Sequence, residues 1–146
     1  MGFKEDLQRG VAVEDDLLRR LRLSFPNAKR AEGLHPAFDI EIPELHKTVE
    51  VKYDPMSQKT GNIVIEYFHR KPSAFSVSSA DYWVIDTGKK EMWFSRKGIL
   101  NCILSEGLEP VCFRGTTDRY SKWAFLIPLH LLQRYSNAVL AEQHEA

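Results

Sequence analysis

Two short segments that alternate apolar and charged residues constrain the fold of this chain most. They cover residues 37–42 (Ala-Phe-Asp-Ile-Glu-Ile) and 48–53 (Thr-Val-Glu-Val-Lys-Tyr), joined through residues 43–47. Alternation with a period of two predicts β-strands, because successive side chains of a strand point to opposite faces of its sheet. The short connection between the segments favours a hairpin.

The hydrophobic pattern also restricts how these two strands pair. Asp39 lies on one face of the first strand, Glu50 and Lys52 lie on one face of the second, and their apolar neighbours lie on the opposite faces. Pairing Asp39 with either Glu50 or Lys52 keeps the apolar residues together, whereas a slip of one residue would mix the two sets. The alternative is a solvated hairpin face with cross-strand ion pairs, each contributing only about 0.2–1 kcal/mol. Glu41 shares the face of Asp39 and is expected to be solvated.

The expected cluster has the composition of a hydrolytic metal site. Two converging carboxylates bind a divalent cation, and a nearby ammonium stabilises an oxyanion, a combination that suits phosphodiester hydrolysis. Glu14 falls on the apolar stripe formed by Leu17, Leu18 and Leu21, where a carboxylate is costly unless a metal or a basic group partners it. The alternative is a rotated stripe with Glu14 at its edge. Glu66, in a third predicted strand, is either a fourth carboxylate of the site or an exposed strand residue.

The remaining pattern predicts one α/β domain that spans residues 1–146. A helix is expected over residues 4–24, either continuous or broken near Gly10, and Pro26 ends it. Further strands are expected at 62–68, 81–86, 91–94 and 123–127, further helices at 96–105 and 129–141, and the start of a short helix or a crossover at 69–79. The order is helix, three-strand meander, crossover, then further strands and helices, which indicates a mixed sheet flanked by helices.

The charge balance excludes an overall basic field. Lys plus Arg and Asp plus Glu number 20 each, so a nucleic-acid partner requires a local basic patch. The best candidate is His69-Arg70-Lys71, which leaves the third strand beside the predicted site and continues to Ser73. Lys59 lies in a loop expected near the same edge. The alternative for each of these groups is an ordinary solvated loop.

Cysteine usage and hydropathy predict a soluble, intracellular (cytoplasmic) protein. The two cysteines, Cys102 and Cys112, have no CxxC spacing and lie in apolar surroundings, as expected for reduced thiols. The N-terminus lacks an apolar signal segment, and the longest apolar stretch is too short to span a bilayer. No membrane association is expected.

The order and setting of these residues resemble the PD-(D/E)XK nuclease superfamily. This group includes restriction endonucleases, archaeal and phage Holliday-junction resolvases and many small phage nucleases. Asp39 matches the first acid of the motif, Glu50 the second and Lys52 the lysine. Glu14 matches an acid often found on the opening helix, and Phe38 stands where the motif has proline. The resemblance covers roughly residues 10–95 and implies a restriction-endonuclease-like mixed β-sheet flanked by α-helices, with an αβββαβ core.

The resemblance also implies an activity, that of a Mg²⁺-dependent endodeoxyribonuclease. Asp39, Glu50 and the main-chain carbonyl of Val51 would hold Mg²⁺ or Mn²⁺, with help from Glu14. Lys52 would orient the attacking water and stabilise the charge that grows on the phosphate. No organic cofactor is expected.

The chain has no spare domain for reading a long DNA sequence, so a structure-selective or weakly sequence-specific enzyme is expected. Cleavage of a junction would require a homodimer. Two alternatives remain open: a non-catalytic nucleic-acid-binding or interaction module that retains the nuclease-like fold, and a structural protein whose charged hairpin is only surface.

Overall fold

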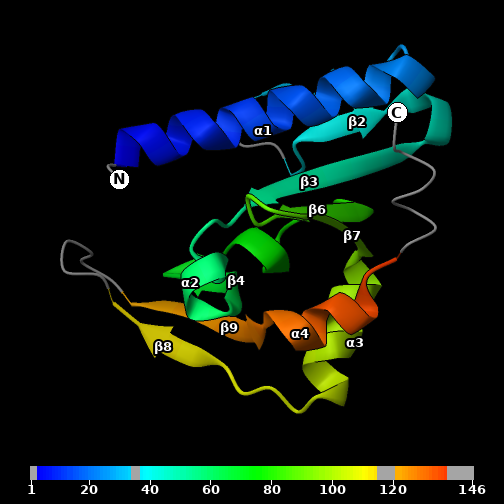
Figure 1. Cartoon of the computed structure of the whole chain (residues 1–146). Coiled ribbons are helices and arrows are strands. Elements are labelled where there is room, and N and C mark those ends of the chain that lie inside the picture. Colours follow the sequence, from blue (N-terminus) through cyan, green and yellow to red (C-terminus); the bar gives the residue numbers. More distant parts are fainter. Residues whose placement is uncertain (1–2, 34–36, 115–120, 138–146) are drawn as a thin grey trace.

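Two β-sheets and the helices that cover them make up the described part of the chain, residues 3–33, 37–114 and 121–137 of the computed structural model (Figure 1). The first sheet has five strands in the order β1-β2-β3-β6-β7, and the second has four in the order β5-β4-β9-β8. The architecture is mixed α/β, as predicted. Of the described helices, none is long and apolar enough to cross a membrane.

Helix α1 (Phe3–Ser24) covers one face of the first sheet and continues through Gly10 without a break. Its predicted stripe of Leu17, Leu18 and Leu21 is buried against Ile40, Ile42, Val49, Val84 and Trp93 of the sheet. Burying a leucine stabilises the fold by about 1.5–3 kcal/mol, so this stripe is what holds the helix on the sheet. The chain leaves the helix at Pro26, as expected.

The first sheet contains the predicted hairpin. Its strands are β1 (Lys29–Arg30), β2 (Ile40–Ile42), β3 (Lys47–Tyr53), β6 (Tyr82–Asp86) and β7 (Glu91–Ser95). The 3-10 helix η1 (Pro43–Leu45) joins β2 to β3, and Ile40 pairs with Val49. The ladder ends at this pair, and the Asp39 N–H bonds the Val49 carbonyl instead of continuing the register, so neither predicted pairing of Asp39 is part of the ladder. Strand β6 lies between β3 and β7, parallel to β3, and its middle residues are buried, which confirms its predicted central position.

The predicted three-strand meander is wrong in its third strand. The segment Asn62–His69 is a strand, β4, but it belongs to the second sheet with β5 (Lys71–Pro72), β8 (Val111–Phe113) and β9 (Lys122–Pro128). After β3 the chain turns through Asp54 and the short helix α2 (Ser57–Thr60). The Asp54 carboxylate accepts the N–H of Val64 at 3.2 Å, so the part of β4 that β5 does not pair with is held next to the first sheet without joining it.

The helices near the C-terminal end match the prediction in one case and not in the other. Helix α3 (Arg96–Ser105) has the predicted bounds, begins with the Ser95 hydroxyl accepting the N–H of Gly98 at 2.9 Å, and is followed by Gly107 with φ +60°. The predicted helix 129–141 is shorter: α4 (Leu129–Leu132) continues as 3-10 helix η3 (Gln133–Tyr135). Asn137 then donates its N–H to the Trp93 carbonyl at 2.7 Å, which draws the backbone onto β7. Residues 138–141 of that prediction lie outside the described part.

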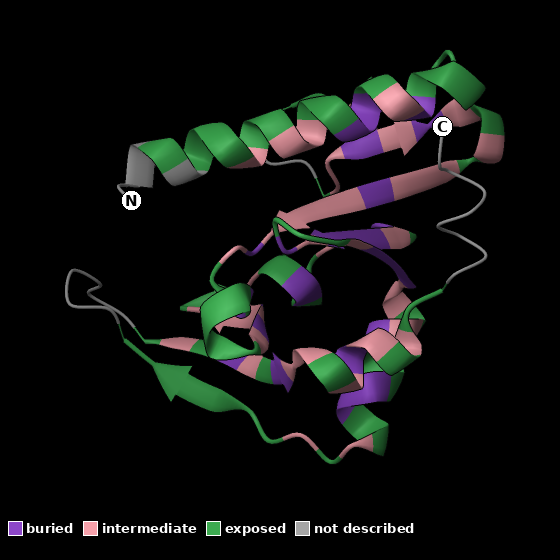
Figure 2. Ribbon diagram, viewed as in Figure 1, coloured by how far each residue is buried: buried purple, intermediate pink, exposed green. Residues whose placement is uncertain are grey.

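Buried residues lie in α1 and in strands of both sheets (Figure 2). They form two apolar clusters, one on each face of the first sheet. The second cluster lies between the two sheets and includes Trp83 and Ile85 of β6 with Ile63 and Ile65 of β4. In the parallel register Glu50 stands beside Trp83, and Lys52 stands beside Ile85. Residues side by side in a register share a face. The charged face of β3 is therefore turned toward the second sheet and is not an open hairpin surface.

Candidate active site

Glu50 and Lys52 open into a cleft between β3 and β4. The cleft has a volume of about 150 Å³, and both side chains are half-buried in its wall. Glu66 of β4 and Trp83 of β6 line it as well. The 3-10 helix η2 (Ala74–Ser76), in the crossover between the sheets, contributes Ala74.

Asp39 lies where β2 and β3 stop pairing. Its N–H donates to the Val49 carbonyl at 2.9 Å, and its Oδ2 accepts the N–H of Val51 at 2.7 Å. The Asp39 carboxylate thus accepts the Val51 N–H in place of a main-chain carbonyl of β2. Since the N–H and C=O of one strand residue point to the same edge, the Val51 carbonyl also lies on the Asp39 side of β3.

Glu14 approaches the same point from α1. It lines a groove of about 250 Å³ with Asp39, Val51 and Tyr53, and its side chain is only 19% exposed. The expected position on the inner face of the helix is confirmed, and the partner that compensates its burial is Arg30 of β1, which forms ion pairs with Glu14 and Asp15. Burial and the charge of Asp39 raise the pKa of Glu14, and Arg30 partly opposes this.

The electrostatics of the cluster centre on Glu50. Burial raises the pKa of Glu50 to about 8, with further contributions from the charge of Asp39, a hydrogen bond to it and the charge of Glu14. Lys52 acts in the opposite direction. At neutral pH the Glu50 carboxyl therefore retains a proton. Three acids this close disfavour one another's ionisation, and a cation placed among them would relieve that repulsion.

The donor atoms fit a hard divalent cation only in part. The Asp39 and Glu50 carboxylates and the Val51 carbonyl are all oxygen ligands, which Mg²⁺ and Mn²⁺ prefer. However, no three Asp, Glu, His or Cys side chains within the described ranges form a set that could hold a metal ion. Arg30 already forms an ion pair with Glu14, and the Val51 N–H donates to Asp39 Oδ2. Asp39, Glu50 and the Val51 carbonyl are the portion of the predicted ligand set that fits.

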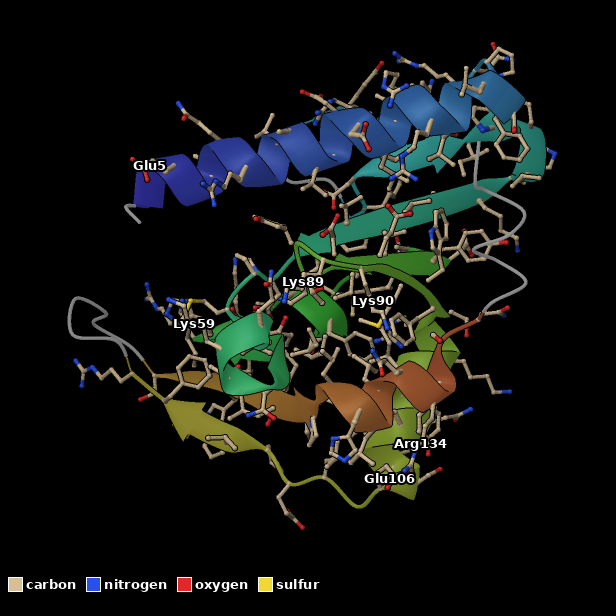
Figure 3. The ribbon with its side chains drawn as sticks, in the orientation of Figure 1. Glu5, Lys59, Lys89, Lys90, Glu106 and Arg134 are labelled. Atoms are coloured by element: carbon tan, nitrogen blue, oxygen red, sulfur yellow. The ribbon has the colours of Figure 1, made fainter. Side chains whose placement is uncertain are left out.

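The residues predicted to contact nucleic acid are dispersed along β4. Ser73 is drawn to the cleft, since its hydroxyl donates to Glu66 Oε1 at 3.3 Å. Arg70 and Lys71 are exposed at the turn between β4 and β5. Lys59 is exposed on α2 (Figure 3). Because α2 precedes β4 and Arg70 follows it, the two residues stand at opposite ends of that strand and not at the same edge as expected.

Arg30 is the member of the site that sequence reasoning missed. It stands in a strand of two residues, and Lys29-Arg30 reads simply as one basic pair among several. The only indication of a basic partner in the sequence was the acidic pair Glu14-Asp15, because Glu14 falls on the apolar face of the helix and so requires a partner.

The chain matches no protein-family model, no curated protein and no solved structure.

Proposed function

We propose that this protein is a divalent-metal-dependent nuclease that hydrolyses phosphodiester bonds in DNA. The observation that carries the proposal is the acidic pair at the open end of the β2–β3 hairpin. Asp39 and Glu50 are close enough to share a hydrogen bond, and Lys52 lines the same cleft as Glu50. A half-buried pair of acids beside an ammonium contributes little to stability, but it suits a site that holds a cation against a phosphate.

Each residue has a distinct task in this proposal. Asp39, Glu50 and the Val51 carbonyl would hold Mg²⁺ or Mn²⁺, which when bound neutralises the scissile phosphate and lowers the pKa of water. To act as a ligand, Glu50 would have to release its proton to solvent. Lys52 orients the attacking water and stabilises the negative charge that develops on the phosphate. Trp83 and Ile65 restrict water on the inner wall of the cleft, which strengthens these interactions.

The proposed fold family is that of restriction endonucleases. Its support is the opening helix packed on a mixed sheet, the acidic hairpin and the parallel strand β6 beside β3. The departure is β4, which leaves the first sheet. Within this fold we propose a structure-selective or weakly sequence-specific endonuclease.

A second candidate is a non-catalytic DNA-binding module with the same fold, and the Arg30 ion pairs favour it. Arg30 already supplies positive charge to Glu14, as a structural cation would. The variant Arg30→Met separates the two: in a nuclease it leaves Glu14 available to the metal and preserves Mn²⁺ binding. In a binding module no Mn²⁺ binds to either protein.

The direct test is cleavage by the purified protein, with Mg²⁺ or Mn²⁺ and a panel of linear, branched and single-stranded DNAs. We expect the wild type to cut at least one of them, and Asp39→Ala, Glu50→Ala and Lys52→Ala to abolish cleavage while circular dichroism shows a folded chain. The control is Glu41→Ala, which removes a more exposed acid on the same hairpin and should retain activity. Full activity in any of the first three variants would overturn the proposal.

A further inference from the structure

A row of apolar side chains, with Phe68 and Trp123 at its centre, crosses the second sheet next to the cleft. Phe68 pairs with Pro72 on one side and with Trp123 on the other, and Trp123 pairs with Cys112. Directly opposite residues share a face, so the row extends across all four strands. Tyr67, Phe68 and Trp123 line a hollow of about 300 Å³ there. Trp123 is 38% exposed, whereas Trp83 and Trp93 are 3% and 2% exposed.

This row continues the core-facing side of the second sheet beyond the part that the first sheet covers. Phe125 and Ile127 of β9 pack into the core, and Trp123 lies two residues earlier on the same face. In β4 the pairing shifts by a bulge between Glu66 and Phe68, which turns Phe68 onto this face. Glu66 lines the cleft, and at about 3.3 Å per residue Phe68 lies roughly 7 Å further along. The hollow is therefore next to the cleft.

The charge of this end of the sheet is positive. Residues 66–74, 110–114 and 121–125 lie within two residues of the row, and they contain four cations, Arg70, Lys71, Arg114 and Lys122, against one acid, Glu66. The residues 115–120 between β8 and β9 include one Asp and one Arg and so add no net charge. The four cations lie within two residues of the row along the chain, a spacing shorter than the Debye length of about 8 Å at physiological salt. An open aromatic surface with cations around it matches a polyanion that carries flat, apolar rings.

We propose that this row is a stacking surface for the unpaired bases of a single-stranded segment of nucleic acid. Aromatic rings stack on any unpaired base, and Lys and Arg contact the phosphates between them. A duplex cannot use such a surface, because its bases already stack on one another. The substrate class rests on the proposed nuclease function. Because the row lies next to the cleft, the substrate is a single strand, or a branched DNA whose unpaired strand passes over the row to the scissile phosphate.

Binding can be measured without cleavage, in EDTA, by the fluorescence anisotropy of a labelled oligothymidylate. We expect Trp123→Ala and Phe68→Ala to weaken binding about 5- to 150-fold each, the range for loss of one base–aromatic stack. The matched control is Leu126→Ala on the same strand, which removes a side chain that is 37% exposed on the opposite face. It should leave the affinity unchanged. Quenching of wild-type tryptophan fluorescence by the same oligonucleotide should report Trp123, since the other two tryptophans are buried.

The salt dependence separates stacking from charge. Trp123→Ala should keep the slope of log affinity against log salt concentration, because it removes no phosphate contact. Equal weakening for duplex DNA, an unchanged affinity for the oligonucleotide, or a dimer in sedimentation that Trp123→Ala merely dissociates would overturn the inference. If Trp123→Ala loses single-strand binding but the wild type cleaves no DNA, the result supports the stacking surface and contradicts the nuclease proposal. If the wild type cleaves DNA but Trp123→Ala binds the oligonucleotide as tightly as the wild type, the result supports the nuclease proposal and contradicts the stacking surface.

Discussion

Replacing Glu50 by glutamine should stabilise the protein and remove part of its pH dependence. The folded state raises the pKa of Glu50 from an ordinary 4.5 to about 8. A carboxyl whose pKa is raised by folding binds more protons in the folded state, so its contribution is fully present below about pH 4.5 and is lost as the pH rises toward 8. Glutamine keeps the shape and hydrogen bonding of the protonated acid and has no proton to lose.

The magnitude follows from the size of the shift. Where the unfolded carboxyl is ionised and the folded one is protonated, each pH unit is worth about 1.4 kcal/mol, and integration from pH 5 to pH 8 gives about 3.5 kcal/mol. The melting temperature of wild type relative to Glu50→Gln should therefore fall by about 10 °C over that interval. Below pH 4.5 the two proteins should differ little.

The assay is thermal or urea unfolding of both proteins from pH 4.5 to 8.5, in EDTA to exclude divalent cations. The control is Glu41→Gln, since Glu41 is a more exposed acid of the same hairpin whose side chain is 41% exposed, and its curve should follow the wild type. Parallel curves for wild type and Glu50→Gln would refute the reasoning. They would mean that Glu50 is ionised in the folded protein and that its neighbours do not converge on it.

Three further changes have defined outcomes. Asp39→Asn removes the nearest negative charge and should lower the pKa of Glu50, which ¹³C NMR titration of the glutamate carboxyls measures. Charge reversal at Arg70 and Lys71 should weaken DNA binding and lower its salt slope by about 2, with Mn²⁺ affinity intact in calorimetry. Ser95→Ala removes the hydroxyl at the start of α3 and should cost about 1 kcal/mol, or about 3 °C in melting temperature, without changing DNA cleavage.

The acidic hairpin was predictable because local pattern determines its register. A slip of one residue would have exposed Ile40 and Val49, and the observed pairing of these two residues keeps both buried, with Asp39 directly before Ile40. Glu14 was predictable for a related reason, since a carboxylate on an apolar stripe requires a partner. Both inferences depend on which face a side chain occupies, and a period of 2 or 3.6 residues encodes that directly.

Partners distant in sequence were not predictable from such patterns. Asn62–His69 has the same alternation whether it pairs with β3 or with β9, so nothing local indicated that it belongs to a second sheet. Consequently the charged face of β3 was expected on an open hairpin. The second sheet instead covers this face, and the resulting burial raises the pKa of Glu50. The last helix was overestimated because its apolar residues continue past Tyr135, while the bond from Asn137 to Trp93 redirects the backbone.

Proton release on metal binding tests the central claim most directly. Calorimetric titration of Mn²⁺ at pH 7, in buffers of different ionisation enthalpy, gives both the affinity and the number of protons released. Because Glu50 holds a proton at this pH and must lose it to become a ligand, we predict one bound Mn²⁺ with release of close to one proton. Glu50→Gln should bind more weakly and release none. Absence of Mn²⁺ binding, or the same affinity and proton release in Glu50→Gln, would contradict the assignment of Asp39 and Glu50 as a metal site.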